Sequence, residues 1–452
     1  MSEASNKDIK TVMSSWTNKT GFPLIIADIS DDNKLILKQI RYLKKGIPNE
    51  NSEDDQTIWS IPINIKTSKN DIKSILFNKK KQEFDIGKTC KFVMLNTEST
   101  GFYCIKYSDK MSKVLINEAI KGDGLSKIDR LVLVRDARML AQCGAKDATV
   151  NLLNLILKFR NETEYIVWAE MIRGLDNVGH LIYNDPSDQK ILDKFYKICL
   201  YILTPIYKTF KTDNNETKTD DSTRSGLFEP LIFGQMSRYG DKDIQKMCFD
   251  KFNKYYTLMY ESDSKDDNGN SADTADDILP AKYKVFVYPC VIKYGGKDEF
   301  KKMKHIYLNA KDVNEKIRAL RTLAKTKDKQ ILLDTLKWVV TSDEVRSQDK
   351  IYYFGSIYKN IYGRDIYWEF IQKNIDKFDD YNKVGIFKTL STFMSDNKVK
   401  EINDFFVKHN ISNAALKTKN QCCEEIKLSS KLRNNEFNNI QSWIDKTIKH
   451  VQ

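Results

Sequence analysis

The chain has 452 residues, of which 41% are hydrophobic and 30% are charged, so its length suffices for two to four domains with hydrophobic cores. It contains no run of about 18 apolar residues, and its opening MSEASNKDIK lacks the apolar segment of a secretory signal, so we expect a cytoplasmic protein with no membrane partner. The formal net charge of +12 raises nucleic acid as a partner. The lysines, however, are spread among acidic residues in short runs such as 79–81, so we expect no nucleic-acid partner.

The first patterned segment, residues 8–17, predicts a helix because its apolar positions are spaced by three and four. These positions are Ile9, Val12, Met13 and Trp16. A turn cluster at residues 17–21 follows, and the pattern then changes to that of strands.

Residues 20–107 carry short segments rich in Ile, Val, Phe and Tyr, which predict strands. The cleanest alternation is that of Trp59, Ile61, Ile63 and Ile65. The expected strands are 24–29, 34–42, 58–67, 72–77, 82–86, 91–95 and 101–107. About seven short strands predict an antiparallel β-sandwich domain.

From residue 108 to residue 452 the apolar period is helical. Ser126 and Asp129 fit a capping box at the start of one helix, and Gly144 fits its end. Further helices are expected at 147–159, 164–177, 188–204, 227–239, 242–260, 281–294, 299–308, 313–324, 329–340, 349–358, 366–376, 384–393, 398–409 and 413–447. Short helices joined by polar turns predict a large all-α helical-repeat superstructure of the HEAT or armadillo kind, with residues 313–340 as its clearest repeat unit.

Two polar insertions, residues 211–224 and 261–277, contain almost no apolar side chains, so we expect disordered surface loops there. The acids of the second insertion lack the spacing of a calcium-binding EF-hand. The eight cysteines are scattered, with no spacing typical of a disulfide framework or a zinc site, so we expect buried thiols.

No catalytic motif stands in these 452 residues. There is no HExxH, no phosphate-binding glycine loop and no GxSxG, and no two of the four histidines lie within one helical turn of each other. With no catalytic motif, ligand binding is the chemistry that the sequence still allows. Arginines and tyrosines on the concave face of a helical repeat can hold peptide carboxylates. The arginines in question are Arg130, Arg135, Arg138, Arg173, Arg238, Arg318, Arg321, Arg346 and Arg364. The alternative for each is an ordinary helix face with structural ion pairs.

A series of short motifs runs along the whole chain: VMSSWT at 12–17, GFPLI at 21–25, GFY at 101–103, DRL at 129–131, YIVW at 165–168, SDEVRSQD at 342–349, GR at 363–364, WEFI at 368–371 and QCCE at 421–424. In this order they resemble the third and fourth domains of the puromycin-sensitive aminopeptidase family. This family of zinc aminopeptidases includes the yeast cytosolic alanine/arginine aminopeptidases and the endoplasmic reticulum aminopeptidases. Residues 354–361 and Ile375 depart from the family pattern, in which small residues and a tryptophan stand there.

The resemblance implies three segments: a remnant of the catalytic domain and linker at 1–19, the β-sandwich at 20–107 and the helical superstructure at 108–452. The family's zinc ligands and catalytic residues match nothing in this chain, so zinc is expected only in the missing catalytic domain and none is expected to be bound here. The resemblance places contacts with peptide substrates in the helical domain. Arg346, Gln348 and Arg364 are the residues we would assign to them.

We therefore hypothesise that the chain is the C-terminal, non-catalytic portion of a zinc aminopeptidase that removes N-terminal residues from peptides. This portion would cap the active-site cavity, contact the peptide, act with the catalytic half in cis or in trans, and be inactive alone. The alternative is a stand-alone helical-repeat scaffold or binding protein that has lost the catalytic function.

Overall fold

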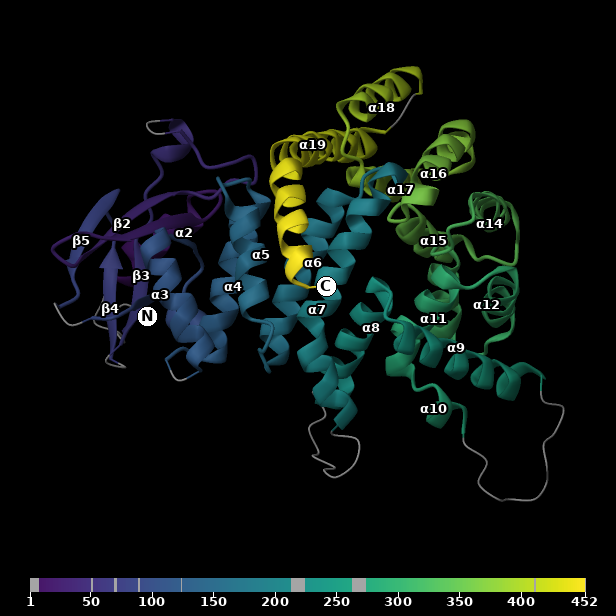
Figure 1. The fold of residues 1–452 in the computed structure, drawn as a ribbon. Coiled ribbons are helices and arrows are strands. Elements are labelled where there is room, and N and C mark those ends of the chain that lie inside the picture. The colour runs from purple at the N-terminus through teal and green to yellow at the C-terminus, as the bar shows by residue number, and fades with distance from the viewer. Residues whose placement is uncertain are drawn as a thin grey trace. The chain divides into compact units, whose positions relative to one another are not determined.

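The computed structural model describes residues 8–49, 52–68, 71–87, 90–122, 124–212, 224–261, 274–409 and 412–451 (Figure 1). Its internal contacts divide the chain into two compact units. Unit 1 comprises Met1–Gly179 and Asn435–Trp443, and unit 2 comprises His180–Asn434 and Ile444–Gln452.

Unit 1 contains two β-sheets. The first has the strand order β5-β2-β1-β7 and the second has the order β4-β3-β6. The strands are β1 (Pro23–Ile29), β2 (Lys34–Arg41), β3 (Ile61–Thr67), β4 (Ile72–Phe77), β5 (Lys81–Asp85), β6 (Val93–Leu95) and β7 (Cys104–Tyr107). The expectation of a purely antiparallel arrangement is wrong in one place, because β1 and β7 pair in parallel with Leu24 opposite Cys104. A parallel pair needs a long crossover, and the strands between β1 and β7 supply it.

Both sheets contribute to one hydrophobic core. Trp59, Ile61 and Ile63 are fully buried, as their alternation predicts, and they share this core with Leu35 and Leu37 of the other sheet. Helix α2 (Ile9–Thr17) packs against the same core through Trp16. The indole of Trp16 donates to the carbonyl of Ser60 at 3.0 Å and lies 6.5 Å from the ring of Trp59.

The helices of unit 1 follow the strands. They are α3 (Asp109–Lys121), α4 (Lys127–Gln142), α5 (Ala148–Lys158) and most of α6 (Tyr165–Ile182). The capping box is confirmed, since Ser126 accepts from the backbone of Asp129 and Asp129 accepts from that of Ser126. Gly144, just past the end of α4, has a φ of 68°, which a glycine adopts without strain.

Unit 2 is helical in its described residues. Its helices are α7 (Gln189–Thr212), α8 (Glu229–Tyr239), α9 (Lys242–Tyr256), α10 (Ala275–Ile278), α11 (Ala281–Tyr294), α12 (Lys297–Asn309), α13 (Val313–Leu323), α14 (Lys329–Thr341), α15 (Lys350–Ile357), α16 (Ile361–Asn374), α17 (Asp380–Thr389), α18 (Asp396–Lys408) and most of α19 (Asn413–Thr447). Helices α11, α13, α15 and α17 pack on one another in succession. Helix α14 packs on α16 (Figure 1). Helix α13 packs more extensively on α12 than on α14, so residues 313–340 do not form a self-contained pair.

The two polar insertions are helical at their described edges, where loops were expected. Helix α7 continues to Thr212, a π-helical turn covers Arg224–Phe228, another covers Thr257–Glu261, and α10 begins at Ala275. Capping and packing against neighbouring helices extend these ends beyond the apolar pattern. The rest of both predicted loops, 213–223 and 262–273, lies outside the described residues.

All eight cysteines carry thiols, and seven of them are buried. This agrees with their interpretation as small apolar side chains. None of the helices in the described ranges is both long and apolar enough to cross a bilayer.

Candidate functional site

Most of the arginines singled out from the sequence are held by carboxylates of the chain itself. The ion pairs are Arg130 with Glu162, Arg135 with Asp136, Arg138 and Arg173 with Glu170, Arg318 with Glu315, and Arg346 with Asp349. Each pair has a carboxylate that is at least nine-tenths buried, which makes its arginine part of the local packing. All six arginines therefore take part in structural ion pairs, and Arg346 combines this pairing with a half-exposed side chain.

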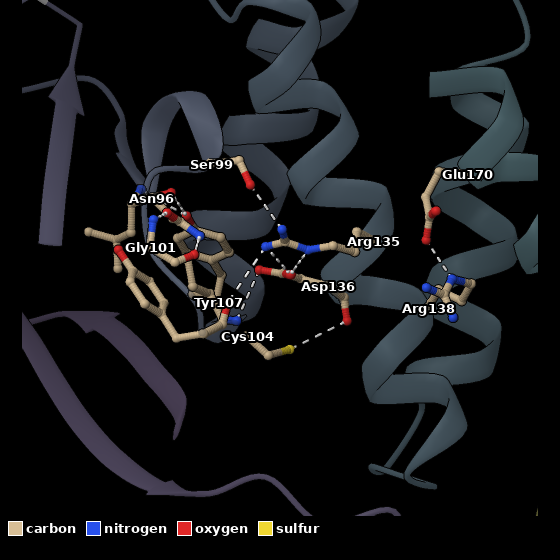
Figure 2. A network of polar contacts seen from close by, with 12 residues as sticks. Asn96, Ser99, Gly101, Cys104, Tyr107, Arg135, Asp136, Arg138 and Glu170 are labelled. Atoms are coloured by element: carbon tan, nitrogen blue, oxygen red, sulfur yellow. Dashed lines mark hydrogen bonds and ion pairs between the residues drawn. The ribbon is translucent and has the colours of Figure 1, made fainter. Parts of the chain in front are cut away.

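Figure 2 shows this type of contact where α4 meets β7 and the segment before it. The Asp136 carboxylate accepts from the backbone N–H of Ile105 at 3.0 Å and pairs with Arg135 at 2.9 Å. Arg135 also donates to the Ser99 hydroxyl at 3.0 Å. Burial raises the pKa of Asp136 to about 6, against the lowering effect of Arg135.

Two turns earlier on the same face of α4, Asp129 is also completely buried. Its carboxylate accepts from the Thr97 hydroxyl at 2.9 Å, from the backbone of Glu98 at 3.1 Å and from the backbone of Ser126 at 3.2 Å. The Lys66 ammonium lies 3.7 Å away. Asp129 and Asp136 thus join α4 to the segments around β6 and β7, and both carboxylates have hydrogen-bond donors and a cation nearby.

Arg346 and Gln348 lie together in the turn before α15. Arg346 precedes a 3₁₀ turn at Ser347–Asp349 and pairs with Asp349 at 2.9 Å, and about half of its side chain is exposed. Gln348 is exposed in the same turn. Both side chains are therefore accessible to a ligand.

Arg364 occupies a different position, on α16. Only 6% of its surface is exposed, and its two terminal nitrogens donate to the carbonyls of Asn184 and Thr392 at 2.8 and 2.9 Å. Its buried Nε has no hydrogen-bond partner among the residues that the structure describes. Burial lowers the pKa of Arg364, against the opposite effects of Asp365 and Asp185. In the described ranges no hydrogen bond or ion pair joins Arg364 to Arg346 or Gln348.

Unit 2 also contains a group of cations that the sequence did not single out, apart from Arg238. We call this group the lysine cluster and define it as Arg238, Lys293, Lys325, Lys327 and Lys359. Its members come from α8, from α11, from the turn between α13 and α14, and from the end of α15. In the described part of the chain, none of the four lysines forms an ion pair with a carboxylate.

The pKa values of two lysines in the cluster reflect the positive charges around them. Burial, followed by the positive charges of Arg238 and Lys327, lowers the pKa of the Lys293 ammonium to about 7. Burial, followed by Lys359 and Arg238, lowers the pKa of Lys325 to about 8. Neighbouring positive charges thus disfavour the protonated forms of Lys293 and Lys325, and an anionic ligand would relieve this repulsion.

His180, near the end of α6, is influenced by the same charge. Desolvation by the surrounding protein, followed by the charges of Arg364, Arg238 and Arg433, lowers the pKa of its imidazole to about 4. The side chain is nevertheless exposed to solvent.

Tyrosines line the same cluster. The Lys293 ammonium lies 4.8 Å from the ring centre of Tyr294 and 5.6 Å from that of Tyr196. Lys327 lies 5.5 Å from the Tyr294 ring. Lys293 and Tyr294 both donate to the carbonyl of Arg238, at 2.9 and 3.1 Å. Aromatic faces hold the cations in place and offer contact surface to a ligand.

The residues present do not fit a zinc ion. No group of three or more His, Cys, Asp or Glu side chains in the described ranges could hold a metal. His180, His305 and His450 lie on separate helical elements, and His409 follows α18. No metal-dependent step is therefore assigned to this chain.

The sequence similarity of the chain to known proteins identifies its family. The family model of the ERAP1-like C-terminal domain matches residues 92–428. The chain belongs to this family. It is also similar to aminopeptidases: it is 28% identical over 414 residues to "Aminopeptidase 2, mitochondrial" of Saccharomyces cerevisiae, and 29% identical over 377 residues to the alanine/arginine aminopeptidase of the same yeast. These alignments cover 90% and 83% of this chain.

A third relative is the puromycin-sensitive aminopeptidase of Caenorhabditis elegans, which is 23% identical over 427 residues and covers 91% of this chain. The chain spans only about two-fifths of these relatives, 40% of each yeast protein and 42% of the nematode one. The ERAP1-like C-terminal domain therefore matches the C-terminal half of such aminopeptidases.

Proposed function

We propose that this ERAP1-like C-terminal domain chain is a non-catalytic portion of a zinc aminopeptidase, which closes the active-site cavity and contacts the peptide. The observation that carries the proposal is the family match over residues 92–428, supported by relatives that are themselves named aminopeptidases. Zinc and the catalytic residues would come from the catalytic half, in the same polypeptide or in a separate one. The protein would act in the cytoplasm.

The proposal includes a domain plan. Residues 20–107 would form a β-sandwich, supported by the two sheets with a common core. Residues 108–452 would form a helical-repeat superstructure related to HEAT or armadillo repeats, supported by the successive packing of α11, α13, α15 and α17. Residues 1–19 would be the end of a catalytic domain with its linker.

For peptide contact we propose the lysine cluster together with Arg346, Gln348 and Arg364. Lys293 and Lys325 supply positive charge without paired carboxylates, and carboxylates of a peptide would pair with them. Tyr196 and Tyr294 would pack against peptide side chains. Arg364 would act indirectly, because its terminal nitrogens are already bound to Asn184 and Thr392.

The test is peptide binding by the full chain. Fluorescence anisotropy should detect binding of labelled acidic peptides that weakens as salt rises, with weaker binding of matched peptides in which Asn and Gln replace the acids. Metal analysis and an alanyl or arginyl fluorogenic amide should reveal neither zinc nor turnover in the chain alone.

Bound zinc with turnover by the chain alone would overturn the proposal. Failure to bind any of these peptides would favour the alternative of a helical-repeat scaffold. Tight, steeply salt-dependent binding of DNA would instead indicate a nucleic-acid partner.

A further inference from the structure

The lysine cluster is held together by contacts between helices that are distant in the sequence. The Lys293 ammonium and the Tyr294 hydroxyl both donate to the carbonyl of Arg238, at 2.9 and 3.1 Å, and so join the end of α11 to the end of α8. The Lys327 ammonium, from the turn before α14, lies 5.5 Å from the centre of the Tyr294 ring, and that of Lys293 lies 4.8 Å from it. Two ammonium groups from different elements therefore share one aromatic ring.

The end of α15 is bound to the same turn. The side-chain amide of Asn360 donates to the carbonyls of Ala324 and Thr326 at 2.8 and 2.7 Å. These two residues flank Lys325, and Lys359 directly precedes Asn360. The two hydrogen bonds therefore place Lys325 and Lys359 on adjoining segments.

Acidic side chains close to the cluster are bound by other groups. Asp328 accepts from two backbone N–H groups in the first turn of α14, at 2.9 and 3.0 Å, and caps this helix. Asp193, whose charge acts on Tyr294, accepts from the Gln189 side chain at 2.6 Å. Neither carboxylate forms an ion pair within the described ranges, so the cluster keeps its positive charge.

We propose that the lysine cluster binds a small anion made of linked phosphate groups, and that this anion competes with acidic peptides for the cluster. The competition rests on the proposed peptide-binding function, whereas the phosphate site does not. Each phosphate carries up to about two negative charges and several acceptor oxygens, and a lysine ammonium is a compact charge with several N–H donors. One phosphate can therefore accept from more than one lysine, whereas a peptide carboxylate offers a single charge.

The cations fall into two groups, which is why linked phosphates fit better than a single one. Arg238 and Lys293 belong to the contact between α8 and α11, and Lys325 and Lys359 belong to the contact between α15 and the turn before α14. Lys327, on the same turn as Lys325, contacts a ring of α11. A single phosphate has one centre of charge, but a diphosphate or triphosphate presents charge to both groups at once.

The test is isothermal titration calorimetry of the full chain with inorganic tripolyphosphate at constant pH and salt. We expect saturable binding of one anion per chain, which weakens as the salt concentration rises. Orthophosphate should bind more weakly, because it reaches only one group of cations. Citrate carries about the same charge as pyrophosphate near neutral pH but offers only carboxylates, so it should bind several-fold more weakly than pyrophosphate.

Two further anions identify the source of the phosphates. ATP carries them on a nucleoside, and inositol hexakisphosphate carries them on a cyclohexane ring. Both share the chemistry of the proposed ligand, and the tightest of tripolyphosphate, ATP and inositol hexakisphosphate names its class.

Matched variants show whether the cluster is the site. The double variant Lys293→Met, Lys327→Met removes two charges that lie near the same ring and should weaken tripolyphosphate binding about tenfold or more. The double variant Lys194→Met, Lys246→Met removes two charges from exposed ion pairs elsewhere and should leave the affinity nearly unchanged. Circular dichroism establishes that both variants are folded.

Chemical labelling of the unaltered chain locates the site if a variant misfolds. Pyridoxal phosphate brings its own phosphate to an anion site and forms an imine with a nearby lysine amine, releasing water, and borohydride reduces the C=N bond to a stable amine. Tryptic digestion and mass spectrometry should find the label on Lys293, Lys325 or Lys327, and tripolyphosphate should prevent it there. The exposed Lys194 should be labelled equally with and without tripolyphosphate.

The phosphate site is overturned if tripolyphosphate does not bind, if citrate binds as tightly as pyrophosphate, or if the control variant loses as much affinity as the cluster variant. Labelling that spares the cluster, or that tripolyphosphate does not prevent there, overturns it as well.

Competition is measured separately, with a labelled acidic peptide in fluorescence anisotropy. Tripolyphosphate should displace the peptide at the concentrations at which it binds in the calorimeter. Simultaneous binding of both would overturn the competition. If tripolyphosphate binds and no peptide does, the proposed function fails while the phosphate site stands, so the two failures are distinguishable.

Discussion

Charged side chains lie partly or fully away from solvent in two regions: where Asp129 and Asp136 of α4 meet the segments around β6 and β7, and in the lysine cluster. The two regions differ in the sign of the charges that face one another. At α4, Asp129 and Asp136 accept hydrogen bonds from backbone N–H groups and side chains, and each has a cation within 4 Å. In the lysine cluster, Lys293 and Lys325 face other cations, and in the described ranges no carboxylate pairs with either. The first arrangement holds the fold together, and the second has charge available for a ligand.

The pKa values express the same contrast. Asp136 keeps a pKa of about 6 despite complete burial because Arg135 offsets part of the cost of desolvation. No carboxylate offsets the desolvation of Lys293 and Lys325 in the described ranges, so burial and the neighbouring positive charges both lower the pKa values of these lysines. Four predictions test this division between a structural site and a proposed binding site.

The largest effect is expected from Asp129→Ala. The change leaves the donors of Thr97, Glu98 and Ser126 without their acceptor inside the protein, so we expect a loss of about 3–5 kcal/mol in the free energy of unfolding. Urea denaturation followed by circular dichroism measures it. Glu164→Ala removes the partly exposed partner of Lys127 and serves as the control, with an unchanged midpoint expected. Equal effects of both variants would contradict a structural role of Asp129.

The next effect concerns the lysine cluster. The double variant Lys293→Glu, Lys325→Glu should weaken binding of an acidic peptide about tenfold to a hundredfold, because each change replaces attraction by repulsion. It should leave the affinity for a neutral peptide of the same length nearly unchanged. The double variant Lys194→Glu, Lys246→Glu, at exposed ion pairs with Asp445 and Asp250, provides a charge-matched control. If the control weakens acidic peptides as much, net charge rather than the cluster accounts for the binding.

A smaller effect is expected from pH. Lys293 and Lys325 gain protons as the pH falls through their pKa values of about 7 and about 8, and the protonated forms attract carboxylates. Affinity for an acidic peptide should therefore rise several-fold from about pH 9 to about pH 6. Anisotropy titrations at constant ionic strength measure this change. The double variant should show a flat profile, and an equally steep profile in the variant would contradict the assignment.

The smallest effect is a change in the titration of His180. Its imidazole should titrate near pH 4, and a bound acidic peptide should raise this midpoint by about half a pH unit, because negative charge nearby stabilises the imidazolium. The ¹H–¹³C resonance of the ring reports the midpoint, and the His180→Gln variant assigns the signal. An unchanged midpoint in the presence of saturating peptide would separate His180 from the binding site.

The sequence by itself determined the kinds of element and much of their placement. The apolar alternation of Trp59, Ile61 and Ile63 predicted a buried strand, and the Ser126–Asp129 pair predicted the start of α4. Both signals are local, since they depend on backbone geometry within a few residues. The motifs that resemble aminopeptidases predicted the family that the comparison then confirmed. The apolar period did not single out α3, which begins at the Ser108 cap.

Only the tertiary structure decided which charged residues remain available. Arg138 and Arg364 look alike in the sequence, yet one pairs with Glu170, 32 residues away, and the other binds the carbonyl of Asn184, 180 residues away. Lys293 and Lys325 look like ordinary helix-end lysines until the helices bring Arg238 close to both. The parallel pairing of β1 with β7 also depends on segments that lie far apart in the sequence. Electrostatic and hydrogen-bond contacts depend on distances in space, and distant segments acquire those distances only when the chain packs.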